Sequence, residues 1–227
     1  ANDILEDLFV KFLEELSEAL NSFHEVTYSN RYWNILLGHW LRQFLQVVIH
    51  RYSSLDNSLK NNKISGVSVH KFKPYSLVTR NRRQFISAIN NQKWNSVLMS
   101  RILSNYDDLD FPVNILGSDE QIELPTDHAN LSTKRKVIKI ISSQLNKVYR
   151  DEDPFLIKTY LAPLDEVKLH LNFRQIPKFW QSPPLDYGQV NERARENLGI
   201  KNTKSEGLEK VSRKLLTELI PTCYLEG

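Results

Sequence analysis

Residues 20–52 read LNSFHEVTYSNRYWNILLGHWLRQFLQVVIHRY, and this stretch decides the fold. From Ser29 onward the apolar residues recur at the spacing of one long helix, and serine is a good cap for a helix start. The apolar face of this helix is wide and continuous, as in a helix that is buried on most sides. It consists of Trp33, Leu36, Leu37, Trp40, Leu41, Phe44, Val47 and Val48.

The remaining side of the same helix is positively charged. At about 100° per residue, six residues fall within a sector of about 120°. We name this set the cationic strip: Arg31, Gly38, His39, Arg42, Gln46 and His50. Guanidinium and imidazole groups beside a glycine are suited to binding anions. A helix with one narrow side in water has the same pattern, so the strip alone predicts no function.

Composition limits the class of protein. The 227 residues suit one large domain or two small ones, and 41% hydrophobic with 25% charged residues is typical of a soluble globular protein. The net charge of +3 is too small to indicate nucleic-acid binding. The single cysteine, Cys223, excludes an internal disulfide. With no apolar run of membrane-spanning length and no signal peptide at the start, we expect a cytoplasmic protein.

Helices dominate the rest of the pattern. The predicted helices cover residues 3–23, 80–103, 132–149, 154–161, 163–169 and 205–219. Short strands are predicted within residues 67–79 and, as a buried strand, over residues 111–116. Irregular or turn structure is predicted over residues 57–66, 118–127 and 176–187. The fold class is therefore α/β, helix-dominated with a few short strands, and we expect one helix-rich domain over residues 1–227.

Common catalytic and cofactor spacings are missing from the sequence. It contains no C-x-x-C, H-E-x-x-H, G-x-G-x-x-G, G-x-S-x-G or P-loop pattern. We therefore expect no metal site and no cofactor, and the catalytic residues stay unknown. Basic clusters at residues 80–83 and 134–136 suit phosphate or plain solvated surface. The acidic pair Asp165 and Glu166 suits acid–base chemistry or an exposed helix start.

The segment LNSFHEVTYSNRYWNILLGHWL resembles the signature of a bacterial transferase family from O-antigen and surface-carbohydrate gene clusters, the Leptospira-type transferases. The residues that match in order are Asn21, His24, Ser29, Arg31, Tyr32, Trp33, Ile35, Leu36, Gly38, Trp40, Leu41, Arg51 and Tyr52. His39 departs from the pattern, because the family usually has proline there. Residues 155–171, 175–180 and 220–227 are similar to the family's middle and to the lead into its second half.

This resemblance implies a glycosyltransferase that moves a sugar from a nucleotide-sugar to a surface polysaccharide. It also implies a two-lobed, GT-B-like fold of which this chain is the N-terminal to middle portion. The chain begins without Met and stops directly after a helix and a proline. We therefore expect a fragment that lacks an N-terminal extension and the donor-binding lobe, and that is inactive alone.

The implied partners are a nucleotide-sugar donor and a glycan or lipid-linked acceptor, with peripheral contact to the inner membrane and no nucleic acid. Arg31, His39, Arg42 and His50 would contact donor phosphates or an acidic sugar. Asn21 and His24, which we expect to be buried, would orient the cationic strip.

Two other functions remain open from the sequence alone. A non-catalytic helical interaction module would use the aromatic helix as core or as partner interface. An acidic partner or nucleic acid, suggested by the basic clusters, ranks third.

Overall fold

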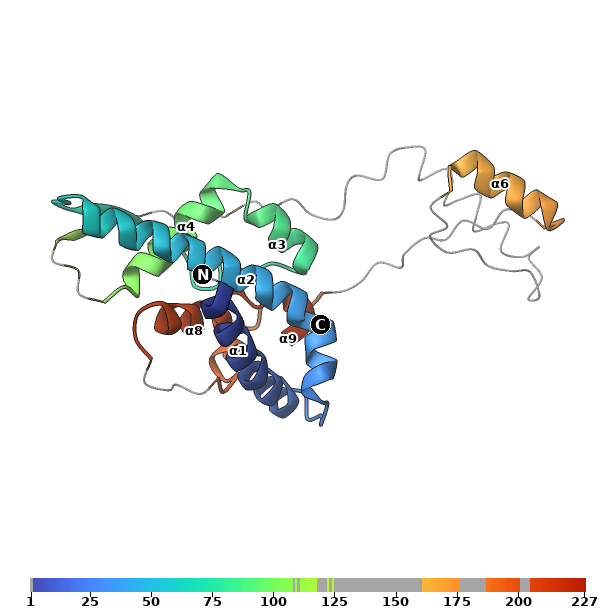
Figure 1. Cartoon of the computed structure of the whole chain (residues 1–227), viewed down its shortest axis with the longest axis horizontal. Helices are drawn as coiled ribbons and strands as arrows, with labels where there is room; N and C mark the ends of the chain where they lie inside the picture. The colour runs from blue at the N-terminus through green and yellow to red at the C-terminus, as the bar shows by residue number, and fades with distance from the viewer. Residues whose placement is uncertain are drawn as a thin grey trace. The chain divides into compact units, whose positions relative to one another are not determined.

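The structure is a computed structural model of the chain, drawn in Figure 1. It describes residues 2–107, 109, 111–117, 122, 124, 161–175, 187–200 and 205–227. The chain divides into two compact units, which we call unit 1 (Ala1–Pro125 with Asp186–Gly227) and unit 2 (Thr126–Leu185). Helices dominate beside a small two-stranded parallel sheet, which confirms the helix-rich α/β prediction. The single domain over residues 1–227 stays a prediction.

Most predicted elements in the described part of the chain are confirmed. The elements are α1 (Asn2–Phe23), α2 (Asn30–Asn61), β1 (Val67–Lys71), α3 (Arg82–Ala88), α4 (Gln92–Ser104), β2 (Val113–Gly117), α6 (Pro163–Asn172), α7 (Glu192–Glu196), α8 (Gly207–Leu219) and α9 (Thr222–Leu225). Of these, α7 and α9 were not predicted. Outside the described residues lie the predicted helix 132–149 and nearly all of segments 118–127, 154–161 and 176–187.

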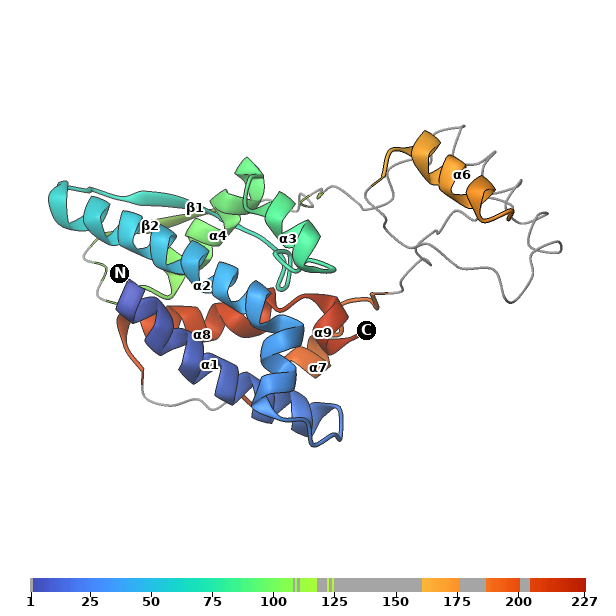
Figure 2. The same cartoon turned by 45° about the vertical axis from the view of Figure 1, so that its right-hand side comes forward.

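Helices α1 and α2 form the centre of unit 1. The hydroxyl of Ser29 accepts the backbone N–H of Tyr32 at 3.3 Å, so α2 begins where the sequence predicts. Phe12 on α1 and Trp40 and Phe44 on α2 are fully buried, and each such side chain contributes about 1.5–3 kcal/mol to folding. Figures 1 and 2 show α2 running between α1 and α8 on one side and α3 and α4 on the other. The apolar length needed to cross a bilayer occurs in none of the described helices.

The polar turn predicted over residues 57–66 is wrong in its first half, because α2 continues to Asn61. Lys60 donates to Asp56 one helical turn earlier at 2.8 Å. The hydroxyl of Tyr106, just after α4, donates to the same carboxylate. These residues are polar because they lie on an exposed helix end, where paired charges support the helix.

The helical region predicted over residues 80–103 is two helices. The side chains of Asn81 and Asn91 each accept a backbone N–H three residues further on, at 2.9 Å, and cap α3 and α4 respectively. A second good cap inside the region therefore starts a second helix. Phe85 of α3 and Trp94 of α4 meet edge to face, with ring centroids 5.8 Å apart.

Strands β1 and β2 pair in parallel, from Val67 beside Val113 to the ends of both strands. A parallel pair needs a long crossover, and α3 and α4 supply it. The strand predicted over residues 111–116 is confirmed, but its predicted burial is wrong. Ile115 and Leu116 are 67% and 45% exposed. The physical reason is that each strand has a single partner among the described residues, so β2 is an edge strand.

The carboxyl end of β1 is fixed by a guanidinium group. Arg101 of α4 donates to the carbonyl oxygens of Phe72 and Lys73 at 3.1 and 3.0 Å. It also donates to the carboxylate of Glu218 of α8 at 3.1 Å. Burial raises the pKa of Glu218, and the nearby Arg101 charge opposes that rise. One arginine thus joins the strand end to two helices.

The C-terminal segment of unit 1 is held by a buried ion pair. Arg195 is fully buried and donates to both carboxylate oxygens of Glu226, at 2.8 and 2.9 Å. It also donates to the carbonyl oxygen of Thr217 at 3.2 Å. Gly188 lies against the same segment with φ +68°, and a Cβ there would come within 2.6 Å of the Glu226 carbonyl oxygen. Only glycine fits this close approach without strain.

Unit 2 contributes α6, which extends the predicted helix 163–169 to Asn172. His170 is fully buried, and its Nδ1 lies 2.5 Å from the side-chain nitrogen of Gln175. Asp165 is exposed and pairs with Lys168 at 3.1 Å within the same helix. For Asp165 the interpretation as an exposed helix start is therefore confirmed.

Candidate functional site

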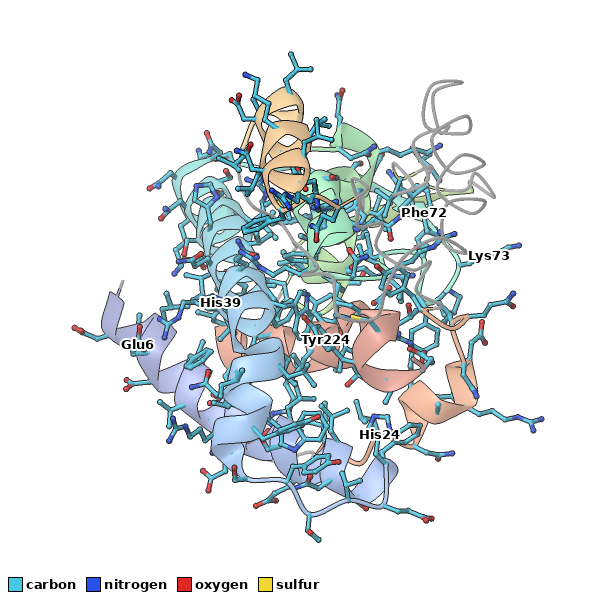
Figure 3. The ribbon with its side chains drawn as sticks, turned by 90° about the vertical axis from the view of Figure 1, so that its right-hand side faces the viewer. Glu6, His24, His39, Phe72, Lys73 and Tyr224 are labelled. Atoms are coloured by element: carbon cyan, nitrogen blue, oxygen red, sulfur yellow. The ribbon has the colours of Figure 1, made fainter. Side chains whose placement is uncertain are left out.

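Four members of the cationic strip reach solvent. As helical spacing predicts, four residues are exposed on the outer side of α2: Arg31, His39, Gln46 and His50. Figure 3 shows His39 on that helix. Arg51 donates to Nδ1 of its neighbour His50 at 3.3 Å. This side of α2 therefore offers several hydrogen-bond donors to an anion.

Gly38 does not belong to this exposed surface. It is buried, and a Cβ there would lie 3.6 Å from the Phe9 ring and collide with the side-chain oxygen of Asn34. The glycine thus leaves room for the Asn34 side chain, one turn earlier on the same helix. On the apolar face, Leu36 is 46% exposed, against the prediction of burial. Gly38 lies at the edge of the cationic strip and Leu36 at the edge of the apolar face. At such edges a neighbouring helix, and not the spacing within α2, decides whether a residue is buried.

Arg42 is already bound within the protein. Its two terminal nitrogens donate to the two carboxylate oxygens of Glu6, the second at 3.1 Å, and its guanidinium lies 4.4 Å from the Phe9 ring centre. The hydrogen bonds from Arg42 hold the pKa of Glu6 below its usual value. Glu6 therefore offsets the charge of Arg42, which weakens the attraction of Arg42 for an anionic ligand.

Asn21 and His24 are half-buried rather than buried. The side-chain oxygen of Asn21 accepts from the backbone N–H of Tyr28 at 3.0 Å and from the indole N–H of Trp33 at 2.9 Å. His24 Nε2 lies 3.0 Å from the carbonyl oxygen of Tyr224 (Figure 3). Asn21 therefore holds the start of α2 in place, whereas His24 contacts the C-terminal helix α9. The predicted orienting role of both residues stays a prediction.

The structure brings the basic cluster of residues 80–83 to the cationic strip. Arg82 donates to the side-chain oxygen of Gln43 at 3.0 Å, and Gln43 lies on α2 one turn after His39. The packing of Phe85 against Trp40 holds α3 there, with ring centroids 6.2 Å apart. Arg80, Arg82 and Arg83 are all exposed. The sequence does not connect the strip with the cluster, because only tertiary packing joins them.

Charge is distributed unevenly along the chain. Residues 26–106 contain twelve Lys and Arg and a single acidic residue, Asp56. The strip and α3 both lie within this stretch. We call their exposed side chains the cationic face: Arg31, His39, Gln46, His50, Arg82 and Arg83. The local excess of positive charge is far larger than the net charge of +3 suggests.

Tyr224 lies next to this face. Burial raises the pKa of its hydroxyl to about 12, and the positive charge of Arg82 opposes the rise. Burial likewise raises the pKa of the neighbouring Cys223 thiol to about 12. Both side chains therefore stay protonated near neutral pH, and the cysteine lacks the thiolate that a nucleophile requires.

A pocket of about 350 Å³ lies elsewhere in unit 1, between α1 and the chain after α7. It is lined by Glu15, Glu18, Ala19, Ser22, Phe23, Asn197, Leu198 and Gly199. Its two carboxylates would repel a phosphate, and no predicted site residue lines it. Across the described ranges, no three His, Cys, Asp or Glu side chains meet in a way that could hold a metal ion. The basic cluster 134–136 falls outside those ranges.

No curated protein and no solved structure matches the chain. A model of one protein family, described as the LIC12162 family transferase, matches residues 1–227. This match confirms the resemblance that begins with Asn21 and His24 and extends to the C-terminal residues. Because it covers the whole chain, the protein belongs to the LIC12162 family of transferases.

Proposed function

We propose that this transferase moves a sugar from a nucleotide-sugar to a bacterial surface polysaccharide of the O-antigen or capsule type. The observation that carries the proposal is the cationic face, where α2 and α3 expose arginines and histidines and Arg82 joins the two helices through Gln43. Nucleotide-sugars carry a diphosphate or phosphate, and many surface glycans carry acidic sugars. The proposed ligand of this face is such an anionic group.

Three residues of the face have the chemistry for this role. Arg31 and Arg82 each offer a planar fork that pairs with two phosphate oxygens at once, whereas a lysine offers a point charge. The exposed imidazole of His39 adds a further donor beside Gln43, which Arg82 already contacts. Arg42 is left out of the proposed contacts because Glu6 holds its guanidinium.

The proposed fold is a two-lobed, GT-B-like transferase. It is supported by the order β1, α3, α4, β2, which is a parallel strand pair joined through helices. Repeats of such units build the lobes of α/β enzymes, and their ligands bind at the carboxyl ends of the strands. At that end of β1, Arg101 fixes the backbone and Lys73 is exposed.

A donor screen tests the proposal. The protein is titrated with UDP-, GDP-, dTDP- and CMP-linked sugars while its thermal unfolding is followed. A ligand at 100 times its dissociation constant stabilises the folded state by about 2.7 kcal/mol. We expect one nucleotide class to raise the melting temperature, and we expect Arg31→Ala and Arg82→Ala to lose at least about tenfold in affinity.

Arg193→Ala is the matched control, because Arg193 is an exposed arginine on α7 outside the cationic face. Equal affinity in all three variants would remove the face from the donor site. If no nucleotide-sugar stabilises the folded protein, the donor proposal fails, and a helical interaction module becomes the better account. Strongly salt-dependent binding to DNA or RNA in place of donors would favour the nucleic-acid alternative.

A further inference from the structure

Large apolar side chains are exposed to solvent at the start of α2. Tyr28, Tyr32, Ile35 and Leu36 are 47%, 41%, 72% and 46% exposed, and all four lie within nine residues. The rings of Tyr28 and Tyr32 lie 4.1 Å apart, so the two contact each other. We call these four residues the apolar ridge.

These side chains are not exposed because α2 lacks a hydrophobic core to pack against. The same turns of α2 direct Trp33 and Leu37 inward, where they are 3% and 0% exposed. The start of α2 is therefore apolar on both its inner and outer sides. Contiguous exposed apolar patches of this kind mark interaction surfaces.

The charges around the ridge are positive. No Asp or Glu occurs from Val26 to Leu55. The exposed Arg31 lies among the ridge residues, and the exposed His39 follows Leu36 by three residues. Toward α3 the surface continues into Arg82, which is bound to Gln43 of α2. The partner that fits this surface is therefore both apolar and anionic.

Exposed acidic side chains lie on α1 and in the loop before the ridge. The exposed acids there are Asp3, Glu6, Asp7, Glu14 and Glu18 of α1, together with Glu25 of the loop. Arg42 neutralises Glu6. An anionic surface is therefore attracted to the exposed cations of α2 and α3.

We propose that the apolar ridge, with Arg31 and His39, docks this protein on the surface of an anionic phospholipid bilayer. Tyrosine rings favour the headgroup level, aliphatic side chains enter the acyl boundary, and arginines pair with lipid phosphates. A second copy of the chain fits less well, because a two-fold interface would place this positive surface against itself. The inference goes beyond the proposed function and does not rest on the donor.

Vesicle co-sedimentation tests the docking. The protein is mixed with vesicles of phosphatidylcholine alone or of phosphatidylcholine with phosphatidylglycerol, at salt concentrations of about 0.1 M and about 1 M. We expect binding to the anionic vesicles that weakens at high salt. Arg31→Ala should weaken it about fivefold at the lower salt concentration, since one arginine near an anionic surface contributes about 1 kcal/mol.

Neutral substitutions test the apolar contribution. Ile35→Gln with Leu36→Gln should weaken binding at least about tenfold, because several methylene groups no longer leave water. Ile115→Gln on β2 is the matched control: the same residue type, 67% exposed, away from α2. Equal vesicle binding by both variants would overturn the proposal, provided circular dichroism shows that both are folded.

Two other results would also overturn the docking. One is no sedimentation with anionic vesicles. The other is concentration-dependent self-association that Ile35→Gln with Leu36→Gln abolishes, since the ridge would then be a contact between copies. Donor stabilisation is also measured on Ile35→Gln with Leu36→Gln, which changes no proposed donor contact, so a failure of membrane docking and a failure of the transferase proposal are distinguishable.

Discussion

Replacing Glu226 by glutamine tests how strongly the buried ion pair holds unit 1. The Glu226 carboxylate accepts two hydrogen bonds from Arg195, and the two side chains are only 6% and 0% exposed. Glutamine keeps the shape but removes the negative charge, which leaves the guanidinium buried without a counter-ion. Breaking a buried pair in this way costs about 3–5 kcal/mol. We therefore expect Glu226→Gln to lower the free energy of unfolding by about 3 kcal/mol.

A double-mutant cycle separates the pair from its surroundings. Arg195→Met should cost a similar amount, but the double variant should cost about 2 kcal/mol less than the sum of the singles. Urea unfolding is followed by the fluorescence of the buried Trp40 and Trp94 and by circular dichroism. Lys11→Met, which breaks an exposed pair with Glu209, should cost less than about 1 kcal/mol. The reasoning would be refuted if each single substitution lowered the free energy of unfolding by less than about 1 kcal/mol and the two losses simply added in the double variant.

Three further predictions concern the backbone at Gly188, the titration of Glu218 and the hydrogen bonds of Asn21. Gly188→Ala should destabilise the protein by at least about 2 kcal/mol in urea unfolding, and Gly199→Ala by only about 1 kcal/mol. Both have φ near +68°, but a Cβ at Gly199 meets no atom nearer than 3.8 Å; equal losses would contradict this. Burial raises the pKa of Glu218 above 4.5, so its contribution to stability is complete below pH 4.5 and is lost as pH rises through the folded pKa. The stability of the wild type relative to Glu218→Gln should fall from about pH 4 to about pH 7, and a rise would refute the assignment. Asn21→Ala should cost about 2 kcal/mol and expose Trp33 to a fluorescence quencher, because the indole N–H loses its acceptor.

The sequence predicted what local patterns control. The start of α2 at its Ser29 cap and the outward direction of Arg31, His39 and His50 follow from helical spacing and one hydrogen bond, and both are confirmed. The parallel pairing of β1 with β2 was not predicted. Strand direction depends on how α3 and α4 carry the chain back, and spacing within a strand does not contain that information.

The candidate site was predicted only in part, because partners distant in sequence decide it. Arg42 pairs with Glu6, which lies 36 residues earlier and which helical spacing within α2 does not reveal. Arg82 joins the cationic face through Gln43, 39 residues away. Gly38 and Leu36 sit at sector edges, where the neighbouring helix decides which side is covered. Helix periodicity orients one helix and cannot place a second beside it.

The short loop between α1 and α2 has a consequence for the order of folding. The two helices meet through contacts between residues close in sequence, such as Ser17 with Asn30. The β1–β2 pair instead joins residues such as Val67 and Val113, with a two-helix crossover between them. Closing the shorter loop loses less chain entropy, and local contacts form faster. We therefore expect pulse-labelling hydrogen exchange to protect α1 and α2 first, with the sheet assembling later on that helical hairpin.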